Sequence, residues 1–339
     1  MTDKHIDFWF DHGLGDVVQV LHLLELYRRR GFTINVHYEI NKKPIWDSAG
    51  YKYIPVDGAQ YHGWKYHSGF NVPQDGDTGH GNKIYGNLCN TDETPLPPLG
   101  TPDEIWTELC EVRIQRHAPI PQEAVNLVSA FVELLPRPLI LLHSKGTNFQ
   151  QSKSIPDPEV EKLYRILLDA MPGSIVLLDW DHRVPKLSHC RMRHVKDDIG
   201  HIDLYTTLAL FDRADLLIGV DSGPYHLAAL TDVPTLGVFH HHYPACVALP
   251  RQQSVNLTRS SYRPQNIARR RRWNLIEYPD HMPSAEHISV HALRMLEGCR
   301  YLPDGGNLAR DIQLQQMVRD WSRQSTGLSR YADRNNTLD

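Results

Sequence analysis

Residues 215–239 constrain the fold more than any other part of the sequence. They read DLLIGV, then DSGPYHLAALTD, then PTLGVF: an apolar strand, a polar turn leading into a helix, and a second apolar strand. Such continuous apolar runs are typical of strands buried on both faces of a parallel sheet. The segment therefore predicts a parallel α/β fold. Four polar or small residues mark the point where strand gives way to helix: Asp221, Ser222, Gly223 and His226.

A βαβ unit is predicted at the start of the chain. Residues 6–10 form an apolar strand, and the turn DHGLGD leads into a helix with apolar side chains at helical spacing over 17–27. Gly31 ends that helix, and alternating apolar positions over 32–38 predict a half-buried strand. The two strands should be parallel with a right-handed crossover.

A second, longer α/β series starts at residue 137. Strands are expected at 138–143, 174–180, 215–220 and 234–239, and helices at 157–171, 203–214, 222–232 and 284–298. Asp157 is the expected N-cap of the first of these helices. A further helix is predicted near 308–324, followed by a polar tail.

Two Rossmann-like halves are the expected organisation, because 339 residues exceed the usual size of one core. We assign residues 1–130 to an amino-terminal domain, 137–298 to a carboxyl-terminal domain and 299–339 to a closing helix and tail, with the halves joined near 125–137. Residues 58–104 are rich in Gly, Asn, Asp and Pro. They are expected to form long loops, either a binding surface or a floppy insertion.

Composition indicates a soluble cytoplasmic protein. Forty acids against 36 bases give a net charge of −4, which is no signature of nucleic-acid binding. The five cysteines form no CxxC pair, which favours reduced thiols, and the charged amino terminus is not a signal peptide. No 18-residue apolar run predicts a membrane span.

Ligands of open parallel sheets bind at the carboxyl ends of the strands, and two glycine-containing turns are expected there. One holds Gly13, Gly15 and Asp16, and the other is the turn at Asp221. Glycine lets a ligand approach the backbone, and a helix start favours an anion, so a diphosphate suits the second turn. Lys145 and Lys153 are the candidate cations.

The motifs together resemble one family. ADLLIGVDSGPYHLAALTDVPTLGVF, with GLGDVVQ near the amino terminus and HSKGTNFQQSKSIP between them, is similar to the ADP-heptose:lipopolysaccharide heptosyltransferases of glycosyltransferase family 9. The resemblance covers most of residues 6–240. It implies the GT-B fold, in which two Rossmann-like domains face each other across a cleft.

The resemblance also implies site roles. The amino-terminal domain would bind the acceptor and the carboxyl-terminal domain a nucleotide-sugar, ADP-heptose by default, with inversion at the anomeric carbon. Asp16 would be the general base, Asp181 would hold a ribose and Asp221 sugar hydroxyls. The remaining donor contacts would come from Ser144, Thr147, Lys153, Ser222, Gly223 and His226. No metal and no cofactor beyond the co-substrate is implied.

Simpler structural roles stand beside these. Asp16 and Asp221 could each cap a helix, His226 could be a core histidine, and Lys153 could be a surface lysine. His240–His242 could bind a metal, but we favour a strand end that lines the cleft. Arg269–Arg272 could be a solvated loop or contact a phosphorylated acceptor or anionic membrane.

Three functions remain open. The first is an inverting glycosyltransferase whose acceptor is a glycan, a lipid-linked saccharide, a protein or another compound, including a nucleic acid base or a small metabolite. Peripheral contact with the inner membrane face is compatible with that reading. The second is a nucleotide-sugar epimerase or hydrolase, and the third is a non-catalytic binding protein on the same scaffold.

Overall fold

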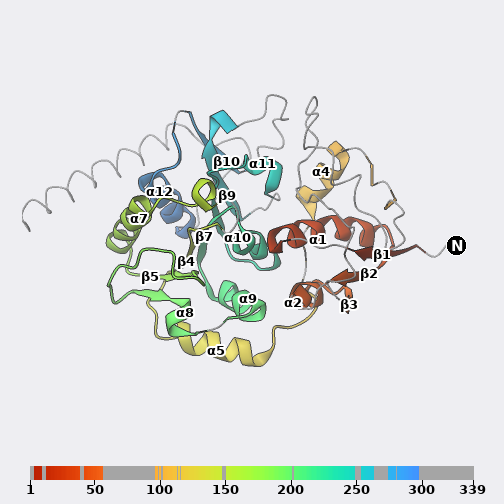
Figure 1. Cartoon of the computed structure of the whole chain (residues 1–339), viewed down its shortest axis with the longest axis horizontal. Helices are drawn as coiled ribbons and strands as arrows, with labels where there is room; N and C mark the ends of the chain where they lie inside the picture. The colour runs from red at the N-terminus through yellow and green to blue at the C-terminus, as the bar shows by residue number, and fades with distance from the viewer. Residues whose placement is uncertain are drawn as a thin grey trace, which may run out of the picture.

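The computed structural model contains two parallel sheets with helices on their faces (Figure 1). It describes residues 4–9, 13–38, 42–55, 96–97, 99–100, 102–112, 114, 116–146, 150–200, 202–248, 253–262, 274–279 and 281–297. Thr147, Arg269–Arg272, the predicted helix near 308–324 and nearly all of 58–104 therefore lie outside the described residues.

The amino-terminal half holds a three-stranded sheet in the order β1-β2-β3. Its elements are β1 (His5–Trp9), α1 (Leu14–Arg29), β2 (Thr33–Tyr38), α2 (Lys43–Ser48), β3 (Lys52–Pro55) and α4 (Pro102–Glu111). β1 and β2 are parallel, with Ile6 opposite Ile34 and Phe8 opposite Val36, and all four side chains are buried in one core with α1. The predicted βαβ unit is confirmed.

The carboxyl-terminal half is built on a seven-stranded parallel sheet. Its first elements are α5 (Gln122–Val132), β4 (Leu139–His143), α6 (Gln150–Lys153), α7 (Asp157–Ala170), β5 (Ser174–Leu177), β6 (Met192–His194), α8 (Val195–Asp198) and α9 (Leu204–Arg213). Then follow β7 (Leu216–Val220), α10 (Gly223–Leu227), β8 (Thr235–Val238), α11 (Pro244–Val247), β9 (Ser254–Arg259), β10 (Leu275–Tyr278) and α12 (Ala285–Leu296).

The strand order β10-β9-β8-β7-β4-β5-β6 contains a switch point between β7 and β4. From β4 the chain proceeds through β5 to β6, and it then returns to the other side of β4 to start β7. Crossovers on the two sides of such a point lead away in opposite directions, which leaves a crevice at the carboxyl ends of the two strands. Residues that follow β4 and β7 therefore flank the preferred binding position of this sheet.

The core is continuous between the halves. One cluster of buried apolar side chains joins Phe8 and Leu21 of the amino-terminal half to Leu141, Val176 and Leu208 of the carboxyl-terminal half. A second cluster fills the opposite face of the large sheet, beneath α7 and α12. Among the described residues, no helix is long and apolar enough to cross a bilayer.

Several local predictions need correction. Helix α1 begins at Leu14, so Gly15 and Asp16 lie in its first turn and Gly13 is its N-cap. The N-cap of α7 is Pro156, and Asp157 is the first helical residue. The segment predicted to join the halves contains α5, which packs on α9. By contrast, Ser284 caps α12 with a side-chain hydrogen bond, as its sequence predicts.

Candidate functional site

The two glycine-containing turns lie against each other. A Cβ atom on Gly15 would be 2.8 Å from Cδ2 of His226, and one on Gly223 would be 2.8 Å from Cδ2 of Leu14. Real Cβ contacts are essentially never so short, so both positions need glycine for close approach rather than for an unusual backbone. The first turn of α1 therefore packs directly on the first turn of α10, as Figure 1 shows for the two helices.

Asp16 lies in the first turn of α1, half-buried. Its carboxylate stays near Gly13, since a Cβ there would be 3.0 Å from Oδ2 of Asp16. Because Gly13 occupies the N-cap, the alternative in which Asp16 is only that cap is wrong. Asp16 follows directly on Gly15, the residue that touches His226.

Asp221 is the centre of a polar cluster at the end of β7. Nε2 of His226 donates to Oδ1 at 3.1 Å, and Nδ1 of His242 donates to Oδ2 at 2.7 Å. The ammonium of Lys153 is 2.8 Å from the same Oδ2. We call Asp221, Lys153, His226 and His242 the Asp221 cluster. Lys153 follows β4 and Asp221 follows β7, so their ion pair spans the switch point of the sheet.

The electrostatics of the cluster keep Asp221 ionised. Burial by itself would raise the pKa of Asp221, but hydrogen bonds from His226 and His242 and the charges of His226 and Lys153 hold it well below its usual range. One buried carboxylate is thus shared by three basic side chains. An arrangement with more basic groups than acids favours a further anion.

The histidine triplet after β8 contributes a residue that the sequence argument did not single out. His242 donates to Asp221, and its side chain is 38% exposed. Burial lowers the pKa of His240 to about 4, and burial with the charges of His242 and Lys153 lowers that of His241. Of the expected strand end, His242 is therefore part of the Asp221 cluster. The spacing from Asp221 could not have revealed this, because the two residues meet only when β7 and β8 pair.

Two hydroxyl groups at the switch point lack partners. Ser144 follows β4 and is fully buried, and Ser222 occupies the N-cap of α10 without capping it. Neither hydroxyl oxygen has a hydrogen-bond partner. Buried hydroxyls without a hydrogen-bond partner are unusual in proteins, and each calls for an explanation.

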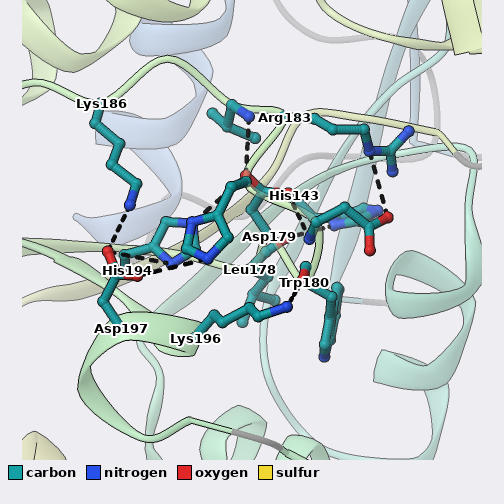
Figure 2. A network of polar contacts seen from close by, with 12 residues as sticks. His143, Leu178, Asp179, Trp180, Arg183, Lys186, His194, Lys196 and Asp197 are labelled. Atoms are coloured by element: carbon teal, nitrogen blue, oxygen red, sulfur yellow. Dashed lines mark hydrogen bonds and ion pairs between the residues drawn. The ribbon is translucent and has the colours of Figure 1, made fainter.

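Two other candidates lie elsewhere. Lys145 is held by the carboxylate of Asp157, and it also donates to the carbonyl of Ile155 at 3.3 Å. Asp181 is exposed, with its carboxylate 3.5 Å from Nε of Arg183. The buried acid after β5 is instead Asp179, which accepts hydrogen bonds from the backbone of Asp181 and Val184 (Figure 2).

Comparisons with known proteins agree with this architecture. Residues 128–274 match the family model described as Glycosyltransferase family 9 (heptosyltransferase). No curated protein shows a significant match to the chain.

Two solved structures are similar. One is ADP-heptose lps heptosyltransferase II of E. coli, 14% identical, with a TM-score of 0.57 over 86% of this chain and 98% of that one. The other is the glycosyl transferase family 9 protein of Veillonella parvula DSM 2008, 16% identical, with a TM-score of 0.54 over 94% and 98%. The predicted GT-B fold is confirmed.

Proposed function

The chain carries a glycosyltransferase family 9 domain and is a glycosyltransferase, and from this premise we propose its reaction. It transfers a sugar, heptose by default, from a nucleotide-diphosphate sugar such as ADP-heptose to an acceptor hydroxyl. The transfer inverts the anomeric carbon and requires no metal. The ADP-heptose donor is carried over from the description of the E. coli relative.

The observation that carries the proposal is the Lys153–Asp221 ion pair across the switch point. The donor diphosphate enters beside it and takes hydrogen bonds from Lys153 and His242. The hydroxyls of Ser144 and Ser222, which lack partners in the folded chain, would donate further hydrogen bonds to it. Both carboxylate oxygens of Asp221 already accept hydrogen bonds or an ion pair. Asp221 therefore acts mainly as the counter-ion that orients the basic groups, rather than as a ligand of sugar hydroxyls.

Asp16 is the general base in this proposal. It accepts the proton of the acceptor hydroxyl while that oxygen bonds to the anomeric carbon. The bond from that carbon to the diphosphate oxygen breaks on the opposite face, and Lys153 stabilises the negative charge left on the departing diphosphate. The contact of Gly15 with His226 supports this arrangement, because it brings the turn of Asp16 beside the Asp221 cluster.

For the acceptor we propose a range of compounds rather than a single one. A glycan, a lipid-linked saccharide, a protein side chain or another hydroxyl compound would bind against the amino-terminal half. A lipid-linked acceptor would place the enzyme at the cytoplasmic face of the inner membrane. Asp181 is retained as a ribose ligand, since its exposed carboxylate follows β5 at the same edge of the sheet.

The test combines binding with turnover. ADP and other nucleoside diphosphates are titrated calorimetrically, and ADP-heptose consumption is followed with a panel of acceptor extracts. Asp16→Asn should reduce transfer by about 10²–10⁴-fold with ADP affinity unchanged. Glu123→Gln is the matched control, because Glu123 also lies in the first turn of a helix, α5. The Glu123→Gln variant should transfer sugar at the rate of the parent.

Each alternative has its own outcome. Release of free sugar without an acceptor would identify a hydrolase, and an isomerised donor would identify an epimerase. Donor binding without turnover in the parent would identify a non-catalytic protein. Failure to bind any nucleoside diphosphate would overturn the proposed donor site.

A further inference from the structure

A second cluster of polar side chains lies at the carboxyl ends of β5 and β6 (Figure 2). His182 is in the loop after β5, His194 is the last residue of β6, and Asp197 is in the first turn of α8. We call these three residues the His194 cluster. Among the described residues they form one group whose ligand atoms could hold a metal ion, all within 4.8 Å of one another.

His194 is oriented by a buried carboxylate. Its Nε2 donates to Oδ2 of Asp179 at 3.4 Å, and Asp179 is fixed by the amide of Val184 at 2.8 Å. With the proton on Nε2, Nδ1 of the neutral ring presents a lone pair. A carboxylate that holds the far nitrogen of a metal-binding histidine is the usual supporting contact in metal sites.

The lone pair of His194 has no hydrogen-bond partner. The residue is 5% exposed, and its Nδ1 is a buried atom without a donor to accept from. Asp197 presents Oδ2 to this nitrogen at 3.9 Å. Nδ1 of His194 and Oδ2 of Asp197 both offer electron pairs, and a cation could bind between them.

His182 supplies the third donor. Its Nε2 is 3.6 Å from Oδ1 of Asp197. The rings of His182 and His194 are stacked, with centroids 4.7 Å apart and planes at 4°. A metal lies in the plane of each imidazole that binds it, so the His182 ring must turn to bind the same ion as His194. Its side chain is 40% exposed, which leaves room for that rotation.

We propose that His182, His194 and Asp197 bind a divalent transition-metal ion, with Zn²⁺ as the best fit. Two imidazoles and one carboxylate suit Zn²⁺, and three protein ligands leave the fourth position to water. Lys186 donates to Oδ2 of Asp197 at 2.5 Å, so the ion competes with its ammonium. Asp179 is a positioning residue for His194.

Bound metal would tie the loop after β5 to the start of α8. That loop reaches the residues after β4, because Nη1 of Arg183 donates to the carbonyl of Gly146 at 3.2 Å. The ion therefore orders the side of the crevice next to the segment that leads to Lys153. This inference concerns metal binding alone and does not depend on the proposed transfer reaction.

The test uses the full chain, purified without a histidine tag and freed of metal with a chelator. Zn²⁺ is titrated calorimetrically, and Co²⁺ reports the coordination through its visible absorption. We expect one ion per chain. His182→Ala and Asp197→Ala should each weaken binding by at least about 100-fold, and both replace exposed side chains that folding does not require.

His189→Ala is the matched control, since His189 lies between β5 and β6 but outside the cluster. It should bind Zn²⁺ as the parent does. Asp179→Asn should weaken binding by about 10–100-fold and shift the Co²⁺ bands, an effect that a purely structural residue would not have. Lys186→Met should tighten binding severalfold. Equal losses in His182→Ala and His189→Ala, or several weak ions per chain, would overturn the proposal.

Discussion

The Asp221 cluster and the His194 cluster lie at the same edge of the same sheet, but their charges are arranged in opposite ways. In the first, three basic side chains share one buried carboxylate. In the second, two carboxylates, Asp179 and Asp197, approach one histidine whose Nδ1 is unpartnered. An excess of donors favours an anion and an excess of acceptors favours a cation. Under our two proposals, the same residue types therefore suit two different ligands.

The largest expected difference between the clusters is in stability. Asp221→Ala leaves the buried His226 and the half-buried Lys153 without their shared carboxylate, which should lower the free energy of unfolding by about 3–5 kcal/mol. Asp197→Ala removes an exposed acid, so the urea midpoint should hardly change in metal-free buffer. Urea unfolding of both variants measures this. Similar small effects would show that the Asp221 cluster is not a buried charge network.

ADP binding should distinguish Lys153, which contacts Asp221, from Lys186, which contacts Asp197. Lys153→Ala should weaken ADP binding by about 10–100-fold, because a charged hydrogen bond of about 1.5–3 kcal/mol is lost. Lys186→Ala should bind ADP as the parent does. Calorimetric titration compares them. An unchanged affinity in Lys153→Ala would move the diphosphate to another position.

Two buried histidines outside both clusters, His143 and His240, provide a third contrast. Burial lowers the pKa of His143 to about 4, and that of His240 likewise to about 4, so both stay neutral in the folded chain. The unfolded chain binds more protons between pH 6.5 and 4, and stability therefore falls as the pH falls through that range. Each of these two histidines should lower the free energy of unfolding by about 2 kcal/mol between pH 7 and pH 5.

Urea midpoints at pH 7, 6 and 5 measure this loss. His143→Asn should lower stability at pH 7 but flatten its pH dependence. A slope equal to that of the parent would mean that burial does not lower the pKa of His143.

The smallest expected effect concerns the other candidate lysine. Lys145 is held by Asp157, away from the Asp221 cluster. Lys145→Ala should therefore change ADP affinity by less than about threefold, since the ammonium of Lys145 is bound to Asp157 rather than to the diphosphate. A loss as large as that of Lys153→Ala would require both lysines to reach the diphosphate.

The sequence was sufficient for the elements whose pattern is local. Apolar runs such as Leu139–Leu142 and 215–220 predict the central strands, because a strand buried on both faces must be apolar throughout. Short elements such as α2 and β3 carry too few periodic positions to be recognised. The predicted N-cap of α7, Asp157, lies one residue after the observed N-cap, Pro156. Prolines at 156 and 158 make both positions suitable for a helix start.

The site was predictable where a motif keeps its residues close in sequence. Asp221, Ser222, Gly223 and His226 lie on one turn, and their common position follows from the strand and helix around them. The pairing of Asp221 with Lys153 and His242 could not be read from spacing, because it depends on the order of the strands. The sequence could not show which acid after β5 is buried: Asp179 is buried, whereas Asp181, two residues later, is exposed.

The shared core has a consequence for how the molecule denatures. Leu141 of β4 and Val176 of β5 lie on one face of the large sheet, and Leu208 of α9 belongs with them to the same cluster as Phe8 and Leu21. Removal of the first half would expose to water the part of this cluster that it covers. We therefore expect the two halves to melt together in a single heat-absorption peak, and a fragment that starts at β4 to precipitate rather than fold.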